Sequence, residues 1–122
     1  MIEAVCHCGA VRVKVPKPPQ EVEVKECNCS ICRRYGSVMA YYSPKDVRVD
    51  GPTDIYMWDD RAIEFHRCKL CGNFTHWWPV DKTLDRMGVN VRLMPPELLA
   101  DIRILKFDGA DTWTVTGERR GL

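Results

Sequence analysis

Seven cysteines, gathered in three short groups, constrain this 122-residue chain more than any other feature of its sequence. The groups are Cys6-His7-Cys8-Gly9, Cys27-Asn28-Cys29-Ser30-Ile31-Cys32 and Cys68-Lys69-Leu70-Cys71-Gly72. The N-terminus has neither a basic region nor a long apolar stretch, so we expect no secretory signal peptide and a cytoplasmic location. Because disulfides are disfavoured in the reducing cytosol, clustered cysteines there indicate metal ligands first.

The first and third groups together predict a four-thiolate metal site. Cys68 and Cys71 belong to a Cys-x-x-Cys-Gly sequence, in which a tight turn directs both thiolates at one ion and the glycine supplies left-handed backbone. Cys6 and Cys8 are spaced more tightly, but they can chelate if the segment bends at Gly9. Two pairs that lie far apart in the sequence make the closed tetrahedral site of structural zinc.

Two alternatives remain for these four cysteines: separate buried thiols without a metal, or a redox pair at Cys68 and Cys71. A thioredoxin-like pair requires a strand-then-helix context. The sequence after Cys71 is instead strand-like and is closed by Pro79. We therefore expect the shared structural zinc.

The middle group places Cys27, Cys29 and Cys32 within six residues. Three thiolates can bind one zinc and leave a fourth position. If water or substrate fills that position, the ion can act as a Lewis acid. If a protein group fills it, the site is a second structural one, and dithiol redox chemistry is a third alternative. The candidates for a fourth protein ligand are the chain's histidines: His7, His66 and His76.

Charge and hydropathy argue against two classes of function. Lys and Arg number 18 against 17 Asp and Glu, and this balance lacks the basic excess that nucleic-acid binding normally needs. No apolar run approaches the roughly 18 residues of a membrane span. With 45% hydrophobic residues the chain has ordinary globular composition, and its length suits one domain over residues 1–122.

Alternating apolar residues predict a mainly β fold. A period of two indicates half-buried strands, and it occurs at 11–15, 22–24, 38–42, 47–49, 63–65, 74–78, 89–93 and 113–115. Turn sequences separate these runs, among them Ser43-Pro44, Asp50-Gly51-Pro52 and Asp108-Gly109. Short strands with frequent turns favour an antiparallel sandwich or a partly open barrel.

Helix is expected to be scarce. Ser30 is placed to cap a short helix that runs through Tyr35 and ends at Gly36. Residues 95–100 predict one or two helical turns, because proline is tolerated at a helix start. Arg33 and Arg34, beside the three-cysteine group, either bind an anionic substrate or lie on a solvated helix face.

The remaining features have structural interpretations beside functional ones. His66 is interpreted as a surface residue or as a support for a ligand rather than as a ligand. His76, Trp77 and Trp78 form an aromatic cluster that is expected in the core, with a pocket wall as the alternative. Residues 108–113 predict a turn that leads into a strand.

The three cysteine groups, in this order, resemble those of the glutathione-dependent formaldehyde-activating enzyme family, also called the centromere-protein-V/GFA domain family. The resemblance rests on Cys6-x-Cys8-Gly-Ala-Val, Cys27-x-Cys29-x-x-Cys32-Arg-Arg and Cys68-x-x-Cys71-Gly, and it runs from about Ile2 to about Trp113. Each motif alone is common, whereas all three in this order are specific. The segment from Gly88 to Trp113 also resembles a subset of bacterial members.

This resemblance implies an Mss4-like zinc-containing antiparallel β fold with two Zn²⁺ ions. On it, Cys6, Cys8, Cys68 and Cys71 correspond to the structural zinc ligands, and Cys27, Cys29 and Cys32 correspond to the catalytic zinc ligands. The implied activity is condensation of formaldehyde with glutathione to S-hydroxymethylglutathione by a carbon–sulfur lyase. Its partners are a glutathione-like thiol and a small aldehyde, and Arg33 or Arg34 would receive a glutathione carboxylate.

The chain departs from the family pattern in two places. Tyr35-Gly36-Ser37-Val38-Met39-Ala40-Tyr41-Tyr42 replaces the usual small-residue stretch, and Trp77-Trp78-Pro79 follows the last group in place of a short loop. The alternative function is a two-zinc binding module for a protein partner or a thiol adduct, without catalysis. Methionine-sulfoxide reduction, which shares the fold family, requires two Cys-x-x-Cys pairs, and only Cys68 and Cys71 have that spacing.

Overall fold

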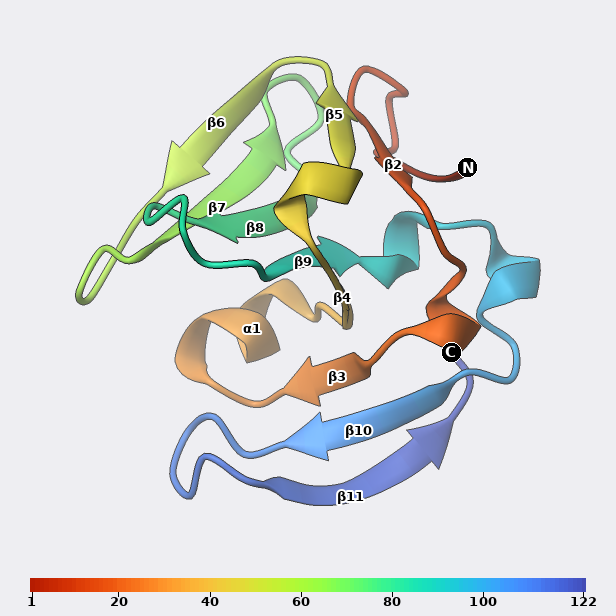
Figure 1. The fold of residues 1–122 in the computed structure, drawn as a ribbon, viewed down its shortest axis with the longest axis vertical. Helices are drawn as coiled ribbons and strands as arrows, with labels where there is room; N and C mark the ends of the chain where they lie inside the picture. The colour runs from red at the N-terminus through yellow and green to blue at the C-terminus, as the bar shows by residue number, and fades with distance from the viewer.

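The strands of this protein form two β-sheets, in a computed structural model that describes all 122 residues (Figure 1). The larger sheet has eight strands in the order β11-β10-β3-β4-β9-β8-β7-β6, and the smaller has three in the order β1-β2-β5. The strands are β1 (Ile2–Val5), β2 (Arg12–Val15), β3 (Val24–Cys27), β4 (Met39–Tyr42), β5 (Arg48–Asp50), β6 (Thr53–Tyr56), β7 (Ile63–Cys68), β8 (Phe74–Pro79), β9 (Met87–Asn90), β10 (Arg103–Phe107) and β11 (Val115–Arg120). The mainly β fold expected from the sequence is confirmed.

One strand pair departs from the expected antiparallel arrangement. β3 and β10 pair in parallel, with Phe107 opposite Cys27, whereas every other pair in the two sheets is antiparallel. Alternation along a strand reports which face is buried, and it carries no information on the direction of the partner strand. The parallel register brings the turn after β10 to the end of β3, beside the three-cysteine group.

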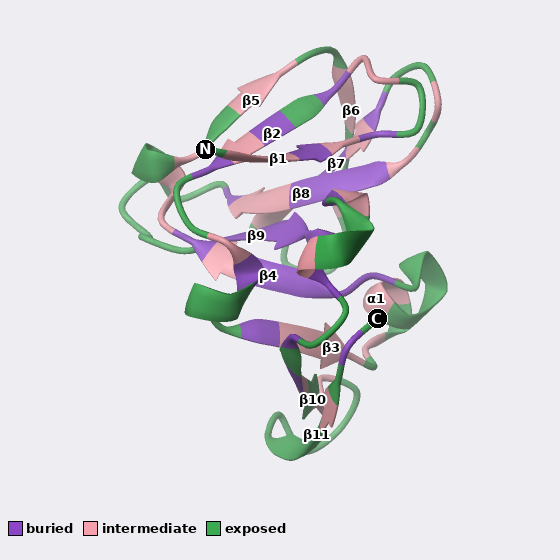
Figure 2. Cartoon of the chain, turned by 90° about the vertical axis from the view of Figure 1, so that its right-hand side faces the viewer, coloured by how far each residue is buried: buried purple, intermediate pink, exposed green.

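The main hydrophobic core lies between the two sheets. Successive side chains of a strand point to opposite faces, and the inward-facing residues of the small sheet pack against those of the large one. The buried members include Ala4, Val13, Val15, Val24, Ala40, Val89 and Ile104. Figure 2 shows these buried segments in purple, most clearly on β2, β4 and β9.

The opposite face of the large sheet carries a second, smaller cluster of Met39, Phe65 and Phe74. Ile31 of the helix α1 (Ser30–Tyr35) packs against this cluster. The ring of Tyr35 stacks on that of Phe74, with 4.4 Å between their centroids. These contacts hold α1, and the cysteines at its N-terminal end, against the sheet.

Helix is as scarce as the sequence predicts. α1 ends at Gly36, which adopts a left-handed φ of 64°, but its N-cap is Cys29 and not Ser30, and no side chain caps it. The other helical segments are single 3₁₀ turns: η1 (Pro19–Glu21), η2 (Pro44–Asp46), η3 (Val91–Leu93) and η4 (Pro96–Leu98). None of these helices has the length and apolar character needed to cross a membrane.

The alternation pattern misses three strands and wrongly places Trp113 and residues 91–93 in strands; Trp113 lies in the turn before β11, with a left-handed φ of 59°. β1, β6 and β10 have no clean apolar alternation, and β6 lies at the sheet edge with two exposed residues. Residues 91–93 were expected to extend a strand but form η3, because Asn90 accepts a hydrogen bond from the Arg92 N–H and turns the chain.

Candidate functional site

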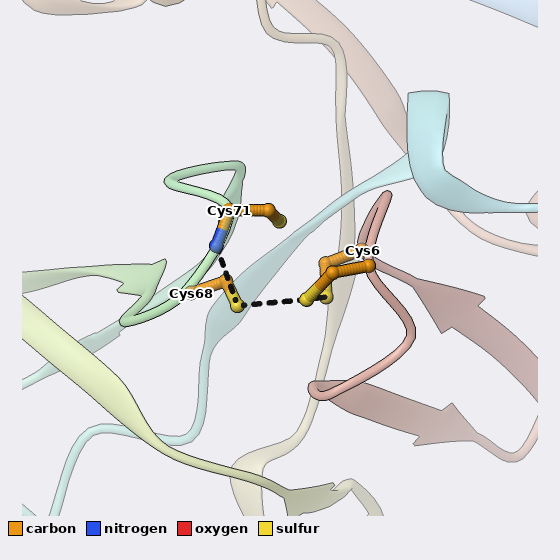
Figure 3. A group of neighbouring side chains, drawn as sticks. Cys6, Cys68 and Cys71 are labelled. Atoms are coloured by element: carbon orange, nitrogen blue, oxygen red, sulfur yellow. Dashed lines mark hydrogen bonds between the residues drawn. The ribbon is translucent and has the colours of Figure 1, made fainter.

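Four cysteine sulfurs meet where the loop after β1 approaches the turn after β7 (Figure 3). The Sγ atoms of Cys6, Cys8, Cys68 and Cys71 all lie within 4.8 Å of one another. Cys8 Sγ is 3.7 Å from Cys6 Sγ and 3.6 Å from Cys68 Sγ. A tetrahedral ion with metal–sulfur bonds of about 2.3 Å separates its sulfurs by about 3.8 Å. The four thiols therefore fit a single tetrahedral metal ion.

Each of the two loops contains a glycine that the sequence predicts to form a tight turn, Gly9 in the first and Gly72 in the second. Gly9 and Gly72 adopt left-handed φ values of 83° and 81°, which residues with a Cβ rarely adopt. The turns direct backbone N–H groups at the sulfurs, with a nitrogen–sulfur distance of 3.2 Å at Cys6 and 3.4 Å at Cys68. Such donors orient the ligands and favour their thiolate form.

The two loops are also joined directly. The backbone N–H of His7 donates to Asn73 Oδ1 at 2.8 Å, across 66 residues of sequence. The backbone N–H groups of Asn73 and Cys8 lower the pKa of Cys71 to about 6. The thiolate is the form that binds metal, and these two N–H groups favour it at Cys71.

The middle group forms a second cluster of three sulfurs. Cys27 ends β3, Cys29 is the N-cap of α1, and Cys32 lies in the first turn of the helix. Their Sγ atoms lie within 4.8 Å of one another, and no histidine, aspartate or glutamate ligand atom joins them. These residues fit three positions around a metal ion and leave the fourth without a protein ligand.

The thiols of this cluster differ in acidity. A hydrogen bond from the Cys32 side chain, assisted by the backbone N–H groups of Cys29 and Gly109, lowers the pKa of Cys27 to about 5. The same pairing, together with burial, raises the pKa of Cys32. The Cys29 N–H lies 3.4 Å from Cys27 Sγ. Of this pair, Cys27 is therefore the sulfur that is held as thiolate.

The turn after β10 packs directly on these cysteines. A Cβ on Gly109 would lie 2.5 Å from Cys27 Sγ and 3.3 Å from Cys29 Cβ, so only glycine fits this position without displacing the cluster. The turn predicted at residues 108–113 is confirmed, since the Trp113 N–H donates to the Asp108 carbonyl at 2.7 Å. Its contact with the cysteines was not predicted.

Asn28, between the first two cysteines of the group, fastens this turn. Its Nδ2 donates to Asp108 Oδ1 and its Oδ1 accepts from the Ala110 N–H, both at 3.0 Å. In the sequence, the only features that could have indicated this contact are the asparagine inside the cysteine group and the distant Asp-Gly turn. They indicate it only once β3 and β10 are known to be neighbouring strands.

A cleft of about 340 Å³ opens beside the three-cysteine cluster. One wall follows α1 and the residues after it, including Arg33 and Ser37, and the other is formed by Lys106 and Phe107 of β10. Cys27 and Cys32 line the same cleft. A small molecule in the cleft would therefore lie beside two of the three cysteines.

The charges around the cleft favour an anion. Arg33 and Lys106 are exposed and have no ion-pair partner. The one acidic residue in the wall, Glu26, accepts two hydrogen bonds from Arg119, each 3.1 Å long. The structure separates the two candidate arginines, because Arg34 donates to the Ser30 carbonyl at 2.8 Å and does not line the cleft.

The three histidines lie outside the three-sulfur cluster. His66 and His76 stack on β7 and β8 with 4.4 Å between ring centroids. His66 is buried, not on the surface, and contacts Thr53 Oγ1 at 2.8 Å and Glu64 Oε1 at 3.0 Å. Burial, with His66 nearby, lowers the pKa of His76 to about 3, so its ring stays neutral.

The two tryptophans beside His76 pack on hydrophobic clusters, as expected. Trp78 packs against the main core and Trp77 against the smaller cluster on the opposite face. Neither lines the cleft. The alternative interpretation, that these aromatic residues form the wall of a pocket, does not apply to this cleft.

The turn after β10 generates a prediction on metal content. Gly109→Ala should remove one metal ion per chain and keep the other, because the added methyl displaces Cys27 but touches none of the four cysteines of the first cluster. Metal content after gel filtration, measured by mass spectrometry, tests this. Gly117→Ala is the matched control, since nothing lies within 4 Å of a Cβ there. Full metal content in Gly109→Ala would contradict the close packing.

Comparisons with known proteins agree with this site. The family model described as "Glutathione-dependent formaldehyde-activating enzyme" matches residues 1–97, which include all seven cysteines but stop short of β10, so Lys106 and Gly109 lie outside it. A solved structure of a Rhodobacter sphaeroides protein, a structural-genomics target, is 32% identical with a TM-score of 0.66, over 75% of this chain and 86% of that one. A search of curated proteins finds no match. The chain belongs to the glutathione-dependent formaldehyde-activating enzyme (GFA) family, whose Mss4-like β fold it shares.

Proposed function

We propose that this chain is a zinc-dependent, carbon–sulfur lyase-type enzyme that condenses formaldehyde, or a related small aldehyde, with glutathione to S-hydroxymethylglutathione. One observation carries the proposal: a cluster of three cysteine sulfurs, with no fourth protein ligand, borders a cleft. The cleft is lined by two positively charged side chains without an ion-pair partner, those of Arg33 and Lys106. Membership of the GFA family supports the choice of substrates.

The two clusters suit different roles. Four thiolates complete the tetrahedron of a structural zinc, and Cys6, Cys8, Cys68 and Cys71 provide them. Cys27, Cys29 and Cys32 provide three ligands, the arrangement of a catalytic zinc with an exchangeable position. When bound there, zinc supplies Lewis acidity, which lowers the pKa of a bound thiol or polarises a carbonyl oxygen.

The reaction itself is an addition without a change of oxidation state. The sulfur of glutathione forms a bond to the carbonyl carbon of formaldehyde, and the π electron pair of the carbonyl moves to its oxygen. The proton that the thiol gave up is returned to that oxygen through water. Atoms and electrons balance, so no redox partner is needed.

The cleft residues would bind and orient the thiol. Glutathione carries two carboxylates, and Arg33 and Lys106 offer a cation on each side of the cleft. Arginine can bind a carboxylate with a forked pair of hydrogen bonds. Binding the two ends of the tripeptide in this way would leave its central cysteine free to reach the sulfur cluster, and proximity of this kind accelerates a bimolecular addition.

Phe107 gives the cleft its apolar part. The ring lies edge-on against Trp113, with 5.1 Å between centroids, and the Lys25 ammonium lies 4.5 Å from its centroid. An apolar wall beside the cysteines reduces the water around the reacting sulfur, and electrostatic interactions with a thiolate are stronger in such surroundings.

The activity is tested by exchange-sensitive NMR on an equilibrium mixture of formaldehyde, glutathione and their adduct. Protein carrying two zinc ions should accelerate the exchange over buffer, whereas Cys29→Ser should not, since it removes a ligand of the proposed catalytic zinc. Exchange no faster than in buffer would show that the protein does not catalyse the proposed reaction. Equal acceleration by wild type and Cys29→Ser would show that the reaction does not depend on this cluster.

The cleft geometry also predicts that the two adjacent arginines differ. Arg33→Ala should raise the KM for glutathione about tenfold, because it removes a charge-assisted hydrogen bond to a carboxylate. Arg34→Ala is the matched control and should leave the KM unchanged, since its side chain bonds to its own helix. Exchange rates measured over a range of glutathione concentrations give both values. An equal effect of the two variants would place glutathione elsewhere.

A further inference from the structure

The most exposed aromatic side chain of the protein lies beside the three-cysteine cluster. Trp113, in the turn after β10, is 71% exposed. A Cβ built on Gly109 would lie 2.5 Å from Cys27 Sγ and 3.6 Å from Trp113 Cζ3, so the indole ring comes within about 6 Å of that sulfur. An apolar contact needs about 3.5–4.0 Å between carbon atoms. A group bonded to a carbon that reacts at this cluster would therefore lie within reach of the ring.

The turn holds this ring on a fixed and unfavourable backbone conformation. Trp113 has a left-handed φ of 59°, which residues with a Cβ seldom adopt. Its N–H donates to the Asp108 carbonyl at 2.7 Å, and the Asp108 N–H donates to the Thr114 carbonyl at 2.8 Å. Asp108 Oδ2 also accepts from the Thr112 N–H at 3.2 Å. Residues in such conformations cluster at functional sites, and these bonds keep the ring at the cluster.

Trp113 and Phe107 together form an apolar surface at the cleft, here called the aromatic wall. Phe107 lines the cleft, and the two rings meet edge to face with 5.1 Å between their centroids. The cations of the cleft, Arg33 and Lys106, match the carboxylates of glutathione, whereas aromatic rings match an apolar group. Formaldehyde has only hydrogen on its carbonyl carbon. The aromatic wall therefore suits an aldehyde that carries an apolar substituent.

We propose that Trp113, with Phe107, binds an apolar substituent of the aldehyde, and that the enzyme prefers aldehydes with an aromatic substituent to formaldehyde itself. This inference rests on the proposed function and narrows its aldehyde. The thiol sulfur still adds to the carbonyl carbon, the π electron pair moves to oxygen, and that oxygen takes up the thiol's proton through water. The substituent takes no part in these changes. Its contact with the indole ring holds the carbonyl carbon near the cluster.

Trp113→Ala tests this role with two aldehydes, formaldehyde and phenylacetaldehyde, each mixed with glutathione and followed by exchange-sensitive NMR. In wild type we expect kcat/KM to be higher for phenylacetaldehyde. Trp113→Ala should lower that value about tenfold and leave the value for formaldehyde within about twofold, because only the substituent contacts the ring. Trp58→Ala is the matched control, since Trp58 is an exposed tryptophan of the loop between β6 and β7. Both zinc ions should remain bound in each variant.

The outcomes separate this role from its alternatives. An equal fall for the two aldehydes in Trp113→Ala would show a structural role and overturn the contact. A glutathione KM raised alike with both aldehydes would place the ring on the thiol and overturn it too. Wild type that accelerates exchange of formaldehyde but not of phenylacetaldehyde would overturn this inference and leave the proposed function in place. Acceleration of phenylacetaldehyde alone would support the contact and correct the aldehyde of the proposed function. Acceleration of neither aldehyde would overturn both.

Discussion

The architecture depends on the meeting of four cysteine sulfurs from two loops that are 60 residues apart in sequence. One loop joins β1 and β2 of the small sheet, and the other joins β7 and β8 of the large sheet. A metal ion bound to all four would link the sheets at one end of the core that lies between them. Such a link restricts the unfolded chain and adds its binding free energy to folding.

The three-cysteine cluster is built from other elements and on the other face of the large sheet. The end of β3, the first turn of α1 and the turn after β10 bring it together, and the aromatic contacts of α1 hold it in place. The two sulfur clusters therefore differ both in composition, four cysteines against three, and in the elements that hold them.

Much of this arrangement was predictable, because cysteine spacing and left-handed glycines are local properties. The groups around Cys6 and Cys68, the glycines that follow them and the end of α1 at Gly36 all follow from neighbouring residues. The turn against Cys27 was not predictable, because it depends on the parallel pairing of β3 with β10. Alternating patterns specify buried faces and leave strand partners open.

The different environments of adjacent residues could also not be predicted without the fold. Arg33 and Arg34 have the same chemistry in the sequence, and only the turn of the helix places one at the cleft and the other against its own backbone. Trp113 carried no signal of its role, since its alternation with Val115 is typical of an ordinary strand. Its exposure beside Cys27 depends on the turn after β10.

X-ray absorption at the zinc edge tests the central claim most directly, namely that one site is closed by sulfur and the other is open. In protein with two zinc ions per chain, the account predicts seven sulfur ligands shared between the two ions, with one lighter ligand, oxygen from solvent or substrate, completing the second. Added glutathione should replace that lighter ligand with sulfur. A spectrum with a histidine nitrogen in the fourth position, unchanged by glutathione, would contradict the account.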